Sequence, residues 1–161
     1  MNVEDVMTQD PVTIQSKATI RDAARIIREK KIGGLPVLDG ENLIGMITES
    51  DILALLETKG PSEDLWLPSP LEVIEIPIRE FFNWEKAKKA LSDIGSRPVS
   101  SVMSYPIITI DADDSVEEAA RIMLRQGVAR LPVLRDGKLT GIVTRADIVE
   151  GIGREREEMA E

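Results

Sequence analysis

Two Thr-x-x-Asp pairs in this sequence have the residue types and the spacing to recognise a phosphorylated sugar. Thr48 and Asp51 form one pair, and Thr144 and Asp147 form the other. Each pair follows an apolar run and stands where a helix is expected to begin. Free backbone N–H groups and the helix dipole favour a phosphate there, with the Thr hydroxyl as a further donor. An ionised Asp accepts hydrogen bonds only, which suits the donor hydroxyls of a ribose.

The same spacing also describes a helix N-cap with an acidic residue at its third position. Such a cap contributes about 1 kcal/mol without any ligand. Because the pair recurs after a Gly-containing strand in both halves of the chain, we favour ligand contact, with capping as a simultaneous role.

Charge distinguishes the two pairs. Arg145 follows Thr144, and Arg130 precedes a Leu-Pro pair, whereas the matching positions of the first half hold Glu49 and Gly34. The second half therefore supplies positive charge to a phosphate, and the first half supplies repulsion. We predict unequal affinities. The sequence leaves open which Thr–Asp pair shares a cleft with which arginine.

These residues lie in a repeated unit. Residues 6–52 align with residues 102–148 without a gap, at a constant offset of 96. A duplication of this kind predicts two similar structural units. The identical residues include Val6/Val102, Met7/Met103, Thr13/Thr109, Ile14/Ile110, Leu43/Leu139, Gly45/Gly141, both Thr–Asp pairs, and the runs Ala-Ala-Arg-Ile and Leu-Pro-Val-Leu.

Each copy predicts the element order β-α-β-β-α. A short extended piece, residues 12–15 or 107–110, precedes a helix opened by Thr19 or Ser115. Two strands then flank a turn marked by Asp-Gly, and a second helix begins near the Thr–Asp pair. The first helix of each copy should bury one stripe, formed by Ile20, Ala23, Ala24 and Ile27 or by Val116, Ala119, Ala120 and Met123.

A unit of about 50 residues buries little surface alone, so we expect two units to pack about a pseudo-twofold axis. The fold class is α/β (α+β), with the repeats at 1–57 and 100–161. The insert between them, residues 58–99, holds Trp66, Phe81, Phe82 and Trp84. It predicts an extended run, LEVIEIPI, and a helix from Asn83 to about Ile94 with Trp84, Ala87, Leu91 and Ile94 on one face and Gly95 as its stop. The aromatic residues either cover a flank of the pair or form a partner surface.

Composition removes many classes of function. The 161 residues include no Cys and no His, which excludes disulfides, zinc fingers, Cys nucleophiles and a His general base. The net charge of −9 argues against nucleic-acid binding. The acidic start MNVEDVMTQD is unlike a signal peptide, and no run of about 18 apolar residues is present. We expect a cytoplasmic protein with no membrane contact.

The repeated unit resembles the CBS (cystathionine β-synthase-type) domain, and the tandem resembles a Bateman module. The resemblance rests on VMTQDPVTI and VMSYPIITI, and on GGLPVLDGENLIGMITESDI and ARLPVLRDGKLTGIVTRADI. It implies a regulatory module that binds AMP, ADP, ATP or S-adenosylmethionine in clefts between the repeats, as a dimer of pairs and without catalysis.

The resemblance also implies that the opening strand and the segment before each Leu-Pro pair line the clefts. Small residues such as Gly33-Gly34 let a planar ring approach the main chain. The alternatives are that these glycines end the first helix, that the prolines keep the chain extended, and that the threonines are ordinary strand residues. The candidates in these segments are Thr13, Gly34 and Pro36 in copy one and Thr109, Arg130 and Pro132 in copy two.

We therefore expect a free-standing, homodimeric ligand sensor that passes occupancy by an adenosyl ligand to an effector protein. The alternative is a structural or protein-interaction module that keeps the fold and binds no physiological nucleotide. The sequence contains no metal cage and no Gly-Lys-Ser/Thr phosphate loop, so we expect no cofactor and no enzymatic activity.

Overall fold

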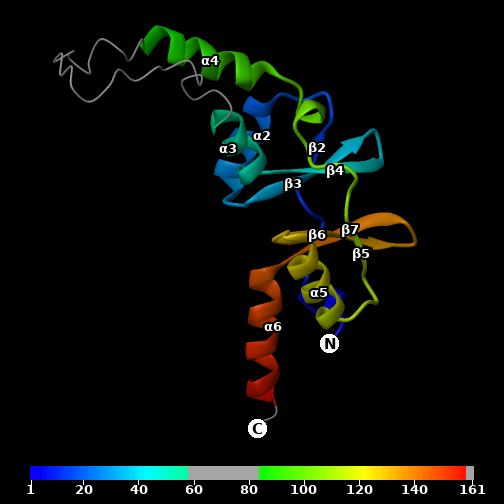
Figure 1. Cartoon of the computed structure of the whole chain (residues 1–161). Helices are drawn as coiled ribbons and strands as arrows, with labels where there is room; N and C mark the ends of the chain where they lie inside the picture. The colour runs from blue at the N-terminus through cyan, green and yellow to red at the C-terminus, as the bar shows by residue number, and fades with distance from the viewer. Residues whose placement is uncertain (58–83, 159–161) are drawn as a thin grey trace, which may run out of the picture.

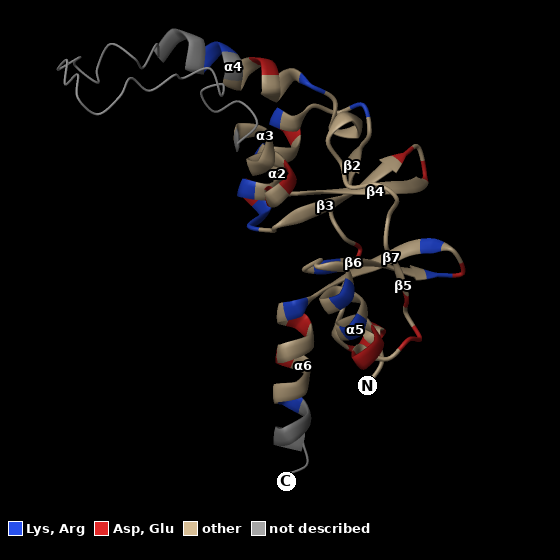
Figure 2. Ribbon diagram, in the orientation of Figure 1, with Lys and Arg blue, Asp and Glu red and all other residues tan. Residues whose placement is uncertain are grey.

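The computed structural model describes residues 1–57 and 84–158, which form two similar α+β units stacked on each other (Figure 1). The predicted extended run and the residues Trp66, Phe81 and Phe82 lie outside the described residues. No described helix is long and apolar enough to cross a membrane. Acidic and basic residues are distributed over both units (Figure 2).

The first unit has a three-stranded sheet in the order β2-β3-β4. Strand β2 pairs with β3 in parallel, and β3 pairs with β4 as an antiparallel hairpin whose turn places Gly40 at φ +63°. The elements of this unit are β2 (Ile14–Gln15), α2 (Ile20–Lys30), β3 (Gly34–Asp39), β4 (Asn42–Thr48), α3 (Glu49–Glu57), α4 (Trp84–Ser96) and the 3-10 helix η2 (Val99–Ser101).

The second unit repeats this arrangement and adds one strand, in the order β1-β7-β6-β5. Its central hairpin has the register of the first unit, because Arg130 pairs with Thr144 as Gly34 pairs with Thr48. The expected packing about a pseudo-twofold axis is confirmed. The elements are α1 (Val3–Val6), β1 (Thr8–Gln9), β5 (Ile110–Asp111), α5 (Val116–Gln126), β6 (Arg130–Arg135), β7 (Lys138–Thr144) and α6 (Arg145–Glu158).

The first helix of each unit begins where the sequence predicts. The Thr19 hydroxyl accepts a hydrogen bond from the Asp22 N–H, and the Ser115 hydroxyl accepts one from the Glu118 N–H. The predicted buried stripe is too wide, because Ala24 is exposed and Ala120 is only half-buried. Ile20, Ala23 and Ile27 of α2 are buried, as are Val116, Ala119 and Met123 of α5.

The first helices end earlier than one alternative assumed. Helix α2 is capped by Lys31 at φ 53°, and α5 is capped by Gly127 at φ 67°. The backbone therefore turns in the left-handed region at the end of both helices. Gly33 and Gly34 therefore do not end α2. A side chain at either position would instead crowd Arg130 of the second unit.

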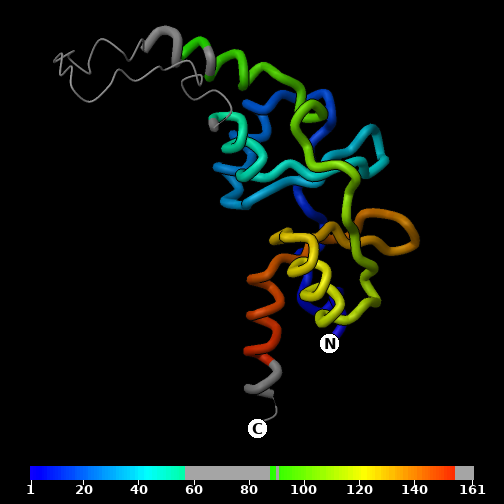
Figure 3. The backbone as a smooth tube through the Cα atoms, in the orientation of Figure 1, coloured from blue at the N-terminus to red at the C-terminus, as the bar shows by residue number. Residues whose placement is uncertain are grey.

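The two units exchange their opening segments, as the path of the backbone shows (Figure 3). The N–H of Val3 donates to the carbonyl of Asp114, and β1 pairs with β7 of the second unit. In the same way, the N–H of Val99 donates to the carbonyl of Ala18. Val3 and Val99 are both fully buried, each in the core of the unit that receives it. Each packed unit thus contains a segment from outside its own repeat.

Helix α4 of the insert packs against α2. It begins near Asn83 as predicted and continues one residue past Gly95 to Ser96. The predicted apolar face is wrong at Leu91, which is 55% exposed, whereas Ile94 is buried.

Candidate functional site

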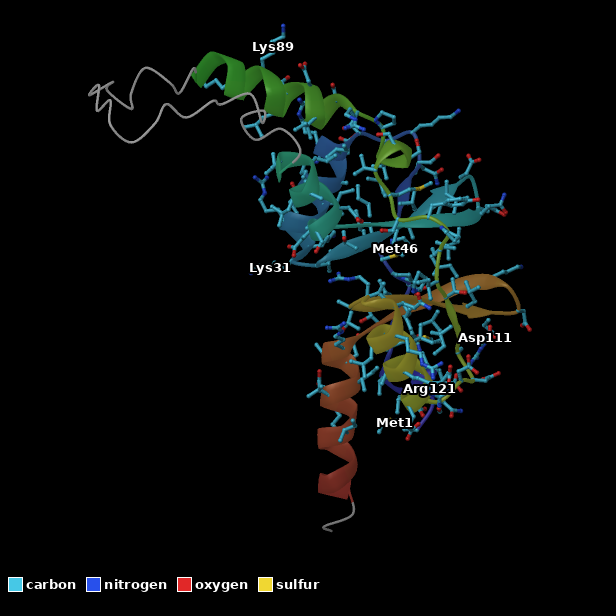
Figure 4. The ribbon with its side chains drawn as sticks, in the orientation of Figure 1. Met1, Lys31, Met46, Lys89, Asp111 and Arg121 are labelled. Carbon is cyan, nitrogen blue, oxygen red and sulfur yellow. The ribbon has the colours of Figure 1, made fainter. Side chains whose placement is uncertain are left out.

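Two clefts lie where the units meet, and the pseudo-twofold axis relates them residue by residue. The first cleft has a volume of about 280 Å³ and the second about 450 Å³. Lys31 and Met46 lie at the edge of the first unit that faces the second (Figure 4). The first cleft is lined by Gly33, Met46, Thr48, Glu49, Ser50, Asp51, Ser104, Pro106, Ile107, Ile108, Gly127, Val128, Ala129 and Arg130. The second is lined by Thr8, Asp10, Pro11, Val12, Lys31, Ile32, Gly33, Gly34, Ala129, Arg130, Ile142, Thr144, Arg145, Ala146 and Asp147.

The two Thr–Asp pairs form capping boxes at the starts of α3 and α6. Asp51 Oδ2 accepts hydrogen bonds from the Thr48 N–H at 2.8 Å and the Thr48 hydroxyl at 3.0 Å. Asp147 Oδ2 accepts the same pair of bonds from Thr144 at 2.7 and 2.8 Å. In each box the hydroxyl oxygen also accepts a bond from the Asp N–H. The predicted capping role is therefore real, and it directs each Thr hydroxyl proton to the carboxylate instead of to a phosphate.

The second oxygen of the Asp51 carboxylate contacts another residue that lines the first cleft. Asp51 Oδ1 accepts a hydrogen bond from the Ser104 hydroxyl at 3.1 Å. Backbone bonds fix each helix start to the residue before the neighbouring strand of the same hairpin, because the Glu49 N–H donates to Gly33 O and the Arg145 N–H donates to Ala129 O, both at 3.1 Å. Each cleft thus presents an acceptor-only carboxylate beside a rigid backbone wall.

Arg130 lines both clefts, together with Gly33 and Ala129. A Cβ atom on Gly33 would overlap the guanidinium, at 2.6 Å from Nη1 and 2.8 Å from Cζ. The missing side chain at Gly33 therefore makes room for Arg130. Burial lowers the pKa of the Arg130 guanidinium, and the negative charge of Glu49 partly opposes this effect.

The charges that line the two clefts differ. The first cleft has two acidic residues, Glu49 and Asp51, and one basic residue, Arg130. The second has Asp10 and Asp147 against three basic residues, Lys31, Arg130 and Arg145. The structure thus answers which arginine accompanies which pair: Arg130 lies in both clefts, and Arg145 lies in the second only.

Four predicted site residues lie elsewhere. Thr13 and Thr109 line a third cavity of about 900 Å³ at the hairpin end of the molecule, together with Leu38, Leu134 and residues of both turns. Pro36 and Pro132 are fully buried in the central strands and line none of these three cavities. The structure brings together Thr48, Asp51 and Arg130 in the first cleft, and Gly34, Arg130, Thr144, Arg145 and Asp147 in the second.

The opening strands were expected to line the clefts, and Val12, Ile107 and Ile108 do so, but sequence reasoning missed Pro11, Pro106 and Lys31. The apolar walls are formed by Pro106–Ile108 in the first cleft and by Pro11 and Val12 in the second, shortly after the segments that the units exchange. The repeat offset of 96 pairs these two segments in the sequence, so the signal was present. Among the described residues, no group of three or more acidic side chains is placed to hold a metal ion.

Comparisons with known proteins agree with this architecture. The family model of the CBS domain matches residues 3–58 and 99–154. An uncharacterized protein of Methanocaldococcus jannaschii, MJ1426, is 35% identical over 154 residues, which are 94% of this chain and 91% of that protein. The chloroplastic CBS domain-containing protein CBSX2 of Arabidopsis thaliana is 30% identical over 151 residues, which are 91% of this chain but only 61% of that protein.

Solved structures with the same fold include complexes with adenosyl compounds. The crystal structure of CBSX2 in complex with AMP superposes with a TM-score of 0.67 at 26% identity, covering 96% of this chain and 98% of that chain. The CBS domain pair of MJ0100, in complex with 5′-methylthioadenosine and S-adenosyl-L-methionine, has a TM-score of 0.69 at 24% identity, covering 95% and 100%. At that identity the second likeness concerns the fold alone.

Proposed function

The chain belongs to the CBS-domain family, and on that premise we propose that it is a regulatory module that binds adenosyl ligands in its two clefts. The ligands we propose are AMP, ADP, ATP or S-adenosylmethionine. The observation that carries the proposal is the pair of symmetry-related carboxylates, Asp51 and Asp147, each fixed at a helix start beside Arg130. An acceptor-only carboxylate suits ribose hydroxyls, and a helix start with a nearby guanidinium suits a phosphate.

The lining of each cleft supports the same class of ligand. Ile107 and Ile108 in the first cleft, and Pro11 and Val12 in the second, give an apolar wall opposite the polar helix start. Small-molecule sites combine such apolar walls with a few fixed polar groups. The structure of CBSX2, which is 26% identical to this chain, contains AMP and so supports an adenosyl ligand. The second cleft, with its three basic residues, is the one we propose for phosphorylated ligands.

We propose no catalytic role for this chain. Its regulatory output would pass to an effector protein, and its place would be the cytoplasm. A homodimer is supported by apolar residues at matching positions of α3 and α6, where Leu53 is 59% exposed and Val149 is 70% exposed. The division of the sequence into repeats at 1–57 and 100–161 and an insert at 58–99 belongs to this proposal.

A thermal shift with AMP, ATP and S-adenosylmethionine tests the binding function. Ligand at about a hundred times its dissociation constant adds about 2.7 kcal/mol to the free energy of unfolding, which raises the melting temperature by about 5–10 °C. No shift with any of the three would contradict the proposal and favour a structural or protein-interaction module.

The Asp147→Ala variant tests whether the carboxylate binds ligand or only caps its helix. We expect ligand affinity at the second cleft to fall about ten-fold or more, measured by titration calorimetry, because a hydrogen-bonded charged acceptor is lost. The matched control is Asp22→Ala, since Asp22 makes the same capping box with Thr19 and lines neither cleft. Hydrogen bonds from Thr19 lower the pKa of Asp22. If both variants keep full affinity, Asp147 is a cap and nothing more.

A further inference from the structure

Arg130 is a single cation placed between two symmetry-related clefts. Its guanidinium lies against Gly33, and its Cδ lies 3.3 Å from where a Cβ on Gly34 would stand. Under the offset of 96 residues, Gly34 is the counterpart of Arg130 itself. The side chain of Arg130 therefore occupies space beside its own symmetry mate, and a second arginine at position 34 would have to share that space.

The surroundings of Arg130 differ on its two sides. On the side of the first cleft, Glu49 and Asp51 are the other charged residues, so Arg130 is the one cation among the described residues that line this cleft. On the side of the second cleft, Lys31 and Arg145 supply two more cations. If the Arg130 side chain turned toward a ligand in the second cleft, the first cleft would keep its two carboxylates and lose the one basic residue described in its lining.

We infer that Arg130 couples the two clefts negatively, so that a phosphorylated ligand in one cleft weakens the binding of a second phosphorylated ligand in the other. The inference rests on the proposed function and adds a regulation to it. When the guanidinium turns toward a phosphate in the second cleft, the first cleft loses its positive charge. If the guanidinium bridges both phosphates instead, each faces the negative charge of the other through a shared wall.

This coupling requires charge on the ligand. An adenosyl ligand without phosphate makes no demand on Arg130, so its two binding events should be independent. ADP and adenosine therefore serve as a pair of probes, because ADP carries a negatively charged diphosphate and adenosine carries no phosphate. Binding free energies couple reciprocally, and a coupling of about five-fold or more is in the ordinary range.

Titration calorimetry on the full chain tests the inference with ADP. In the wild type, we expect two unequal events, the weaker at the first cleft. In Asp147→Ala, where the second cleft is impaired, the first cleft should bind ADP more tightly than the first cleft of the wild type does, by about five-fold or more. In Arg130→Gln and Arg130→Gln/Asp147→Ala, this difference should vanish. Adenosine should show no such difference in any of these proteins.

Two further variants separate the coupling from a folding defect. Gly33→Ala keeps the arginine but places a Cβ where the guanidinium lies, so it should also reduce the coupling. Arg125→Gln changes an exposed arginine in the last turn of α5 that lines neither cleft, and should leave the coupling intact. Independent ADP binding in the wild type, or coupling that survives in Arg130→Gln, would overturn the inference and leave the proposed function standing. Failure of both ADP and adenosine to bind would overturn the proposed function and the coupling with it.

Discussion

The Thr–Asp pairs cap two helices, and the proposed function gives their carboxylates a second role in ligand binding. In both pairs the Oδ2 atom takes the bonds from the threonine, at 2.7–3.0 Å. Asp51 Oδ1 has only the Ser104 hydroxyl as its partner among the described residues, and a ribose hydroxyl is a donor of the same kind. Capping therefore orients the Asp51 carboxylate through Oδ2, and the proposed function assigns Oδ1 to a ribose hydroxyl.

Gly45 and Gly141 are identical in the two copies because an exchanged segment passes close to each. A Cβ on Gly45 would lie 2.7 Å from Met103 Sδ and 3.0 Å from the carbonyl oxygen of Ser104. A Cβ on Gly141 would likewise lie 3.0 Å from the carbonyl oxygen of Thr8. A methionine side chain can move, but each carbonyl belongs to a segment that pairs with the same sheet. The glycine is required by this approach of the backbone.

Gly45→Ala should lower the free energy of unfolding by about 1–3 kcal/mol, because the added Cβ pushes the 103–104 segment off β4. The matched control is Gly153→Ala in α6, where a Cβ meets nothing within 4 Å. That change should raise the free energy of unfolding by about 0.5–1 kcal/mol, since alanine favours a helix over glycine. Urea denaturation measures both. A neutral Gly45→Ala variant would show that the segment is not held closely.

The exchanged segments are the elements that join the two repeats into one structure. Met1 accepts a hydrogen bond from the Val116 N–H, and Glu4 forms an ion pair with Arg135 of β6. On the other side, the Ser104 N–H donates to Met46 O at 2.7 Å. Since Thr8 and Ser104 of these segments also line the clefts, the same exchange that stabilises the units shapes the clefts between them.

Val3→Ala and Val99→Ala test this exchange as a matched pair, because the two residues are symmetry mates and both are fully buried. Each should cost about 1–3 kcal/mol of unfolding free energy through lost burial. Val3→Ala should speed hydrogen exchange in β6 and β7 more than in β3 and β4, and Val99→Ala should do the reverse. Faster exchange of β3 and β4 in Val3→Ala would contradict the exchange of segments.

The sequence predicted the repeated elements well because each depends on local signals. Caps at Thr19 and Ser115, apolar periodicity and turn glycines act within a few residues. The exchange of segments and the position of Arg130 depend on contacts between residues about 100 positions apart, which periodicity does not encode. The same limit placed Thr13 and Thr109 with the Thr–Asp pairs, although they lie in the third cavity.

At the scale of the whole molecule, apolar residues remain exposed in a pattern that follows the pseudo-twofold axis. Leu53 and Leu56 on α3 are 59% and 44% exposed, and their counterparts Val149 and Ile152 on α6 are 70% and 53% exposed. In each helix the two residues are three positions apart and so share one face. A surface of this kind is typical of an interface. We therefore place the proposed homodimer contact on α3 and α6.

The double variant Leu53→Glu/Val149→Glu should convert the proposed dimer to a folded monomer, because it buries two like charges in each half of the contact. Light scattering gives the mass, and circular dichroism confirms the fold. Leu124→Glu is the control, since Leu124 is 77% exposed and belongs to α5 instead of α3 or α6. A dimer that persists in the double variant, or one that dissociates with Leu124→Glu alone, would move the interface away from α3 and α6. A wild-type chain that is monomeric would remove the homodimer from the proposed function and leave the clefts within one chain as the whole of the sensing unit.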